Sequence, residues 1–87
     1  MITYPIPRTN SKGQTIWHNA HGARHREDGP AFEDPDGTKV WYRHGFLHRE
    51  DGPAVIWDNG VKYWFLNGAQ YEPMEWLIKV HELKNKS

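Results

Sequence analysis

His-Arg-Glu-Asp-Gly-Pro-Ala occupies residues 25–31, and the same heptapeptide returns unchanged at residues 48–54. The two copies begin at His25 and His48, so the step between them is 23 residues. Self-similarity at a fixed spacing of this size is typical of repeat architectures, in which each unit packs against its neighbours. The heptapeptide therefore marks the unit from which the fold is built.

The same step continues outside the heptapeptide. Gly37 and Gly60 are 23 residues apart, and Gly13 lies 24 residues before Gly37. One tryptophan follows each of these glycines by four residues, and a second glycine follows each tryptophan by four or five. The tryptophans are Trp17, Trp41 and Trp64, and the second glycines are Gly22, Gly45 and Gly68. The first unit therefore carries one extra residue before its second glycine.

Each unit has the pattern of a β-hairpin. In the third unit, Asn59-Gly60 separates an apolar run at residues 54–57 from another at residues 61–66. Asn-Gly between apolar runs is the strongest short-range hairpin signal. In the middle unit, we predict strands over residues 31–33 and 38–43 on either side of a turn.

The first hairpin begins close to the N-terminus. We predict that its first arm is Ile2–Arg8, followed by a turn at residues 10–13. Pro5 and Pro7 lack an N–H and cannot donate to a central ladder. This arm is therefore expected at an edge of the sheet.

The last segment changes from a strand pattern to a helical one. Over residues 73–84 the residues Trp76, Val80 and Leu83 fall at positions i, i+4 and i+7, with Leu77 beside them. The segment starts with a proline, which suits the first position of a helix. We predict an amphipathic helix that packs on the sheet and ends the array, as terminal elements of repeat proteins do.

These patterns predict a mainly β fold. It is an array of about three antiparallel β-hairpin repeats that form a twisted sheet, capped by one C-terminal α-helix. A chain of 87 residues has room for one small domain. The predicted units of this single domain, residues 1–87, are residues 1–24, 25–47 and 48–71, with the helix at residues 73–85.

Composition excludes several classes of protein. The chain has no cysteine, so it has neither a disulfide nor a thiolate metal site. Eleven basic residues balance eleven acidic ones, which argues against general nucleic-acid binding. No apolar run approaches about 18 residues, so no membrane insertion is expected. The N-terminus lacks the pattern of a signal peptide. The expected location is the cytoplasm of a bacterial host.

The pattern resembles a known repeat family. Residues 41–45, Trp-Tyr-Arg-His-Gly, precede the second heptapeptide, and residues 64–68, Trp-Phe-Leu-Asn-Gly, take the same place one unit later. Over residues 13–71 the chain resembles the MORN repeat, and more closely the variant MORN-like repeats of bacterial and bacteriophage proteins. The resemblance implies an elongated, twisted antiparallel sheet that serves as an interaction module. This chain departs from the pattern in the extra residue of its first unit and at His44, which replaces an asparagine.

The heptapeptide has a structural interpretation and two functional ones. Its histidines and carboxylates are possible metal ligands, and they are also possible partner contacts. Because the motif recurs at the period of the fold, we favour a joint between hairpins, in which Asp caps backbone groups, Gly takes unusual dihedral angles and Pro fixes the next strand. We expect no metal. The predicted joint residues are His25, Arg26, Asp28, Gly29, His48, Arg49, Asp51 and Gly52.

No catalytic residues are predicted. The two serines, Ser11 and Ser87, stand in a turn and at the terminus. The glycines belong to hairpin turns rather than to a phosphate loop, and an open sheet is a poor place to enclose a substrate. We therefore expect no enzymatic activity and no cofactor.

Residues that break the repeat are the predicted binding residues. Asp34 stands where the third unit has Trp57, so the third hairpin is apolar on both of its faces. We expect one face to take the helix and the other to bind a partner or a second copy. The predicted partner-binding residues are Tyr42, Trp57, Phe65, His21, His44 and Trp76.

The predicted function is a non-enzymatic protein-binding module. Together with the small size and balanced charge, the resemblance implies a phage-derived inhibitor of a host protein, such as an anti-CRISPR or other anti-defence protein. One alternative is an antitoxin or immunity protein that neutralises a cognate toxin. Another is a structural module that associates with itself, because an open sheet edge can pair with a second chain to form a homodimer.

Overall fold

The computed structural model describes residues 2–85, so Met1 of the predicted first unit lies outside it. As predicted, the fold is mainly an antiparallel β-sheet capped by a single C-terminal helix. The elements are β1 (Ile6–Thr9), β2 (Thr15–His18), β3 (Phe32–Glu33), β4 (Lys39–Val40), β5 (Tyr42–Arg43), β6 (Phe46–Leu47), β7 (Val55–Ile56), β8 (Lys62–Leu66), β9 (Ala69–Tyr71) and α1 (Pro73–Lys84).

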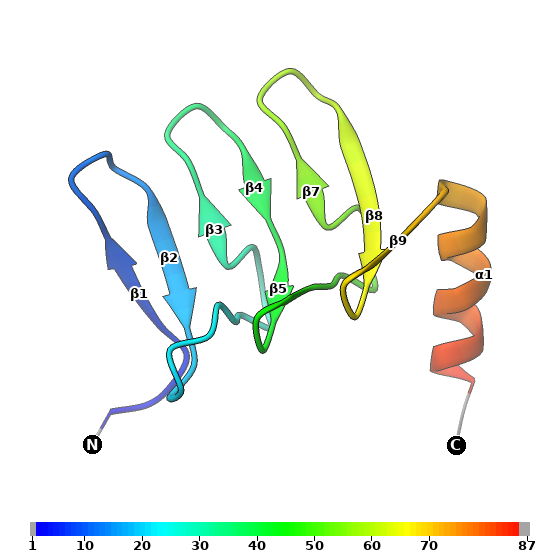
Figure 1. Ribbon diagram of the computed structural model, residues 1–87, viewed down its shortest axis with the longest axis horizontal. Coiled ribbons are helices and arrows are strands. Elements are labelled where there is room, and N and C mark those ends of the chain that lie inside the picture. The colour runs from blue at the N-terminus through cyan, green and yellow to red at the C-terminus, as the bar shows by residue number, and fades with distance from the viewer. Residues whose placement is uncertain (1, 86–87) are drawn as a thin grey trace.

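Three long hairpins stand side by side in chain order, and α1 lies beside the last of them (Figure 1). Seven strands pair in the order β1-β2-β3-β4-β7-β8-β9, and β5 and β6 form a separate two-stranded hairpin. The molecule measures 39 × 35 × 17 Å along its principal axes. An array this thin leaves much of both sheet faces open to solvent.

The tryptophans of the first two long hairpins bond through their backbone to the hairpin that follows. The backbone N–H of Trp41 donates to the carbonyl oxygen of Ala54 at 2.7 Å, and that of Trp17 donates to Ala31 at the same distance. The strand predicted over residues 38–43 is therefore split into β4 and β5. The tryptophan amide bonds to the next hairpin, and this bond links the units along the array.

The short turns that join β5 to β6 and β8 to β9 have the geometry that Asn-Gly favours. Asn67 and Gly68 have φ angles of 49° and 85°, and His44 and Gly45 have φ angles of 48° and 88°. Two successive positive φ angles are typical of a two-residue type I′ turn. His44 thus takes the same conformation as Asn67, although it is not an asparagine. The longer first turn is held differently, because Asn19 Oδ1 accepts the backbone N–H groups of two later residues.

The first hairpin lies at the open edge of the sheet, as predicted. Its first strand is shorter than expected, because it begins at Ile6 rather than Ile2. Ile6 pairs with His18, the last residue of β2. Residues 2–5 therefore have no neighbouring strand with which to pair.

Helix α1 packs on the last hairpin through one narrow stripe. Leu66, Trp76 and Val80 form the buried cluster, and Trp64 and Tyr71 pack against it. The indole Nε1 of Trp76 also donates to the carbonyl oxygen of Arg49 at 3.1 Å. Within residues 2–85, no helix has both the length and the apolar character needed to cross a membrane.

Two residues predicted with this stripe do not belong to it. Leu77 is 55% exposed, and Leu83 is exposed as well. The prediction that they pack on the sheet is wrong, because α1 packs mainly on the end of the array, at β8 and β9. This narrow end of the sheet covers a single row of helix side chains.

Candidate functional site

Each heptapeptide holds its arginine against the tryptophan of the preceding strand. The guanidinium carbon of Arg49 lies 3.8 Å from the centre of the Trp41 ring, and that of Arg26 lies 4.1 Å from the centre of the Trp17 ring. This is the geometry of a cation–π contact. Arg49 also donates to the Asp51 carboxylate at 2.7 Å and to the carbonyl oxygen of Pro53 at 3.0 Å. Stacking on Trp41 therefore fixes the plane of the guanidinium, and the two hydrogen bonds fix its edges.

The glycine of the heptapeptide makes room for this arginine. A Cβ atom on Gly52 would lie 2.9 Å from the Cζ of Arg49, and one on Gly29 would lie 2.9 Å from the Cζ of Arg26. Neither glycine has a positive φ angle. The expected unusual dihedral angles at these glycines are therefore wrong, and close approach of a side chain is the reason that glycine fits here.

The histidine of each heptapeptide braces the next hairpin. The Nδ1 of His48 accepts the backbone N–H of Asn67 at 2.9 Å, and its Nε2 lies 2.8 Å from the Glu50 carboxylate. Because a carboxylate only accepts, the ring proton belongs on Nε2. His25 makes the same pair of contacts, with the N–H of His44 and with Glu27. Both nitrogens of each buried ring are thus engaged within the protein.

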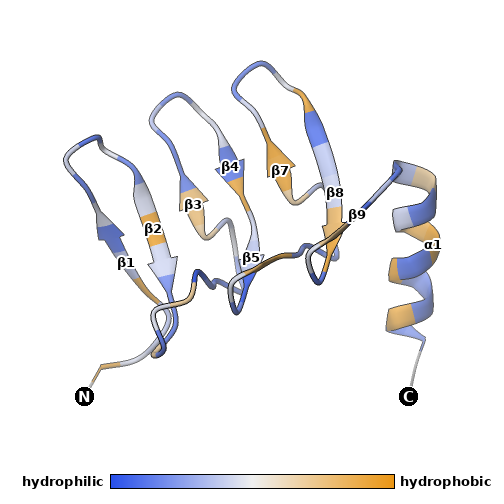
Figure 2. Cartoon of the chain, in the orientation of Figure 1, coloured by the Kyte–Doolittle hydropathy of each residue, from blue (hydrophilic) through white to orange (hydrophobic). Residues whose placement is uncertain are grey.

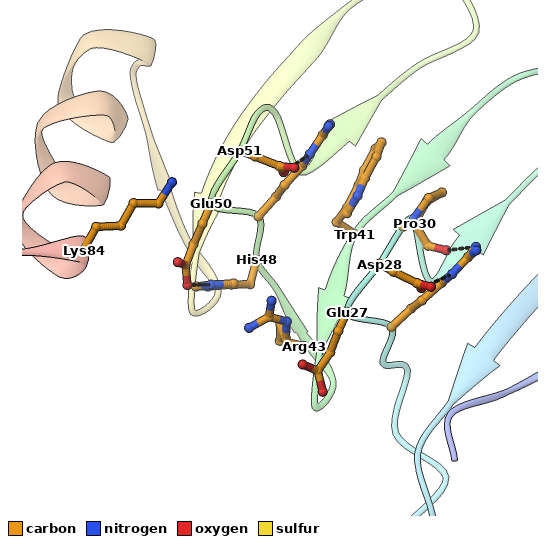
Figure 3. A pocket seen from close by; sticks show the side chains of 12 residues that line it. Glu27, Asp28, Pro30, Trp41, Arg43, His48, Glu50, Asp51 and Lys84 are labelled. Carbon is orange, nitrogen blue, oxygen red and sulfur yellow. Dashed lines mark hydrogen bonds and ion pairs between the residues drawn. The ribbon is translucent and has the colours of Figure 1, made fainter. Parts of the chain in front are cut away.

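An open groove of about 550 Å³ separates the two heptapeptides. Figure 3 shows Arg43 between the two joints and Lys84 reaching toward the groove from α1. Four cationic side chains and four carboxylates line the groove, so their charges balance. They are Arg26, Arg43, Arg49 and Lys84, with Glu27, Asp28, Glu50 and Asp51. Among residues 2–85, no three His, Asp or Glu side chains are grouped so as to hold a metal ion.

Asp51 in this groove has a depressed pKa. The hydrogen bond from Arg49 is the main cause, and the charges of Arg49 and Lys84 add to it, while partial burial opposes it. Since the folded state lowers the pKa below its ordinary value of 3.8, the stabilisation by Asp51 is complete above that pH. It is lost as the pH falls through the folded-state value.

Asp51→Asn should therefore remove part of the acid sensitivity of the fold. The expected result is a smaller fall in the free energy of unfolding of the variant than of the wild type between pH 4 and pH 2.5, with parallel curves from pH 5 to pH 7. Urea denaturation at each pH, followed by tryptophan fluorescence, measures this difference. Parallel curves over the whole range would show that Asp51 and Arg49 are not coupled.

A second groove is lined by residues of all three long hairpins. It encloses about 440 Å³ and is lined by Gln14, Arg24, Phe32, Asp34, Asp36, Thr38, Val40, Tyr42, Trp57 and Asp58. The guanidinium carbon of Arg24 lies 5.8 Å from the centre of the Phe32 ring and 5.4 Å from that of Tyr42. A hydrogen bond from the Gln14 amide, helped by the backbone N–H of Asp36, lowers the pKa of Asp34. The groove therefore keeps a carboxylate beside aromatic rings.

The residues predicted to bind a partner do not form one patch. Tyr42 and Trp57 line the second groove, whereas Phe65 is half-buried and Trp76 lies in the buried cluster under α1. His44 stacks on His25 with ring centres 4.0 Å apart. His21 is exposed in the longer first turn. Of this set, Tyr42 and Trp57 are the two that share a groove.

The outer face of α1 is an apolar surface that the sequence reasoning missed. Met74, Leu77 and Ile78 are 69%, 55% and 56% exposed. They follow one another at i, i+3 and i+4, so they lie on one side of the helix. Figure 2 shows apolar bands on α1 and a fully apolar β7. The signal was present, since Leu77 and Ile78 follow Trp76 directly and a single inward stripe cannot take all three.

Comparison with known proteins gives no relative of this chain. No family model, no curated protein and no solved structure matches it.

Proposed function

We propose that this chain is a non-enzymatic protein-binding module whose partner docks on the C-terminal third of the fold. The observation that carries the proposal is the exposed apolar surface on this part of the chain. Seven large apolar residues are exposed there, namely Trp57, Val61, Tyr63, Met74, Leu77, Ile78 and Leu83. Exposed apolar side chains gathered in one region are typical of protein interaction sites.

The rest of the molecule supports a binding role over a chemical one. The groove between the heptapeptides has balanced charge, and Arg26, Arg49 and His48 are already engaged by the fold. The repeat array offers a stiff scaffold, and its last unit departs from the repeat by adding apolar residues. Such a departure serves the helix or a partner rather than the array.

The MORN-like resemblance suggests the biological form of this binding. We propose an inhibitor of phage origin that blocks a protein of its bacterial host, such as a component of a defence system. An antitoxin that covers a cognate toxin makes the same physical demand, which is a stable scaffold that presents an apolar surface. The two forms differ in the captured partner, which is a host defence component in one and a toxin in the other.

Two polar substitutions on the helix test the proposed surface. Leu77→Gln with Ile78→Gln removes two exposed apolar side chains, and these do not belong to the buried cluster. Because apolar anchors at the centre of an interface each contribute about 2 kcal/mol, the affinity for a partner captured from host lysate should fall more than about tenfold. Isothermal titration calorimetry with the purified partner measures the loss, and the partner's activity should fall on adding the wild-type chain.

The same helix supplies the control. Lys79→Gln with Glu82→Gln changes an exposed pair 4.0 Å apart, which contributes little to stability, so partner binding should be nearly unchanged. Binding that survives the apolar double substitution and is lost with the charge substitution would contradict the proposed surface.

Self-association is a second candidate, favoured by the apolar stripe of Met74, Leu77 and Ile78. Two such helices can pack against each other about a twofold axis. Sedimentation velocity over a hundredfold range of concentration separates the two candidates. A concentration-dependent dimer that the apolar double substitution abolishes supports self-association, and a monomer throughout removes it.

A further inference from the structure

Trp57 occupies a turn position at which the other two long hairpins have a capping residue. The backbone N–H groups of Asn10, Asp34 and Trp57 each donate to the carbonyl oxygen four residues later, so the three positions are equivalent. Asn10 and Asp34 also accept a backbone N–H of their own turn through a side-chain oxygen. Tryptophan has no acceptor, so the third turn gives up this bond for an indole that is 46% exposed.

The other tryptophans of residues 2–85 are covered by the protein. Arginine guanidinium groups lie over Trp17 and Trp41, and Trp64 and Trp76 belong to the packing under α1. Trp57 has no such arginine within the described residues. The chain twice pairs an indole with a guanidinium and an aspartate, and at Trp57 it presents the indole and aspartates alone.

The groove that Trp57 lines has an excess of negative charge. Asp34, Asp36 and Asp58 stand against the single cation Arg24, which leaves a net charge of −2. The groove between the heptapeptides, in contrast, is balanced. Arg24 lies over Phe32 and Tyr42, so this groove already accommodates one guanidinium against two of its aromatic rings.

The sheet spacing leaves room for a second cation. Lys39 pairs with Ile56, which places Thr38 opposite Trp57, and Asp34 bonds to Thr38 on its other side. Asp34 and Trp57 are thus two strand spacings apart, or roughly 10 Å. A planar cation stacked on the indole is within reach of carboxylates on both sides.

We propose that this groove binds an arginine side chain of a partner protein, stacked on Trp57 and paired with the carboxylates of Asp34 and Asp58. The proposal rests on the proposed function in one respect, because the arginine is taken to belong to the bound protein. The proposal adds to that function the chemistry of the partner's docking segment, which carries a basic side chain where it enters the groove. Charge complementarity and the exposed indole together select this occupant.

Titration with three short peptides tests the proposal. The probes are acetyl-Ala-Arg-Ala-amide, its lysine counterpart and its citrulline counterpart, in which a neutral urea replaces the guanidinium. Two-dimensional NMR of the ¹⁵N-labelled full chain should show a saturable shift of the Trp57 indole N–H with the arginine peptide. The lysine peptide should shift it less, because an ammonium cannot stack flat. The citrulline peptide should leave it unshifted, since it carries no charge.

Variants locate the binding in the groove. Because Trp57→Ala removes the indole N–H, the variants are compared through the backbone amide shifts of the groove. Trp57→Ala and the milder Asp58→Asn should each weaken binding of the arginine peptide at least about fivefold, and added salt should weaken it for the wild type. Phe46→Ala is the matched control, because Phe46 is an exposed aromatic residue that does not line the groove and lies outside the apolar surface proposed for the partner. Equal shifts from the arginine and citrulline peptides, or binding that Trp57→Ala leaves unchanged, would overturn the proposal.

The peptide experiment is independent of the helix substitutions. If Leu77→Gln with Ile78→Gln abolishes partner capture while no peptide binds, the arginine site is wrong and the proposed function stands. If the arginine peptide binds while those substitutions leave capture intact, the arginine site stands and the helix surface is wrong.

Discussion

Trp76→Ala should destabilise the protein by about 3–5 kcal/mol, which is typical for removing a buried tryptophan. Trp76 is 8% exposed and packs with Leu66 and Val80. Its indole Nε1 also donates to the carbonyl oxygen of Arg49, so the substitution removes both packing and the bond that ties α1 to the second heptapeptide. A domain of this size has about 5–10 kcal/mol of stability in total. The loss is therefore large enough to detach the helix.

Urea denaturation followed by far-ultraviolet circular dichroism measures this effect. Leu77→Ala is the matched control, because Leu77 is the next residue of the same helix and is 55% exposed. Its cost should stay below about 1 kcal/mol, as for most surface substitutions. If the two variants lost the same stability, the observed orientation of α1 on the sheet would be incorrect.

Arg49→Ala should cost about 2–4 kcal/mol through the joint between the second and third hairpins. The guanidinium stacks on Trp41, which contributes about 0.5–2 kcal/mol. It also donates to a carboxylate and to a backbone carbonyl oxygen, and hydrogen bonds of a charged group contribute about 1.5–3 kcal/mol each. These contributions overlap, because the same placement of the side chain makes all of them.

Arg49→Lys separates charge from shape. Lysine keeps the positive charge but lacks the planar group that stacks on an indole and donates along two edges. We therefore expect it to restore less than half of the stability lost in Arg49→Ala. Arg43→Ala is the control for loss of charge, because Arg43 lines the same groove and its guanidinium makes no hydrogen bond or ion pair within residues 2–85 in this structure. Full rescue by lysine would show that charge alone stabilises the joint.

The array and its cap could be predicted from the sequence because both depend on local patterns. Repeated glycines and tryptophans fix the hairpins, and the spacing of Trp76 and Val80 fixes the helix. The break between β4 and β5 at Trp41 could not be predicted in the same way. It arises because the Trp41 amide bonds to Ala54 of the next hairpin, which is a contact between units that no local pattern contains.

The candidate sites were harder to predict for the same reason. The heptapeptide shows that His48 and Arg49 recur, but their contacts lie with Asn67 in the next turn and Trp41 in the preceding strand. The groove at Trp57 is likewise formed by three neighbouring hairpins. The prediction for Leu77 is wrong because its position on the helix lies between the inward and the outward face. Whether the sheet covers such a residue depends on the width of the sheet, which the helical spacing does not contain.

The brace made by His48 has a consequence for how this molecule can change in size. Each histidine contacts the turn of the following hairpin and nothing further along the chain, so a joint requires only two adjacent units. A duplicated stretch from one heptapeptide to the next brings its own donor, acceptor and stacking partner with it. The sheet can therefore grow or shrink by whole units through simple gene duplication or deletion, while the helix at one end and the free edge at the other stay as they are.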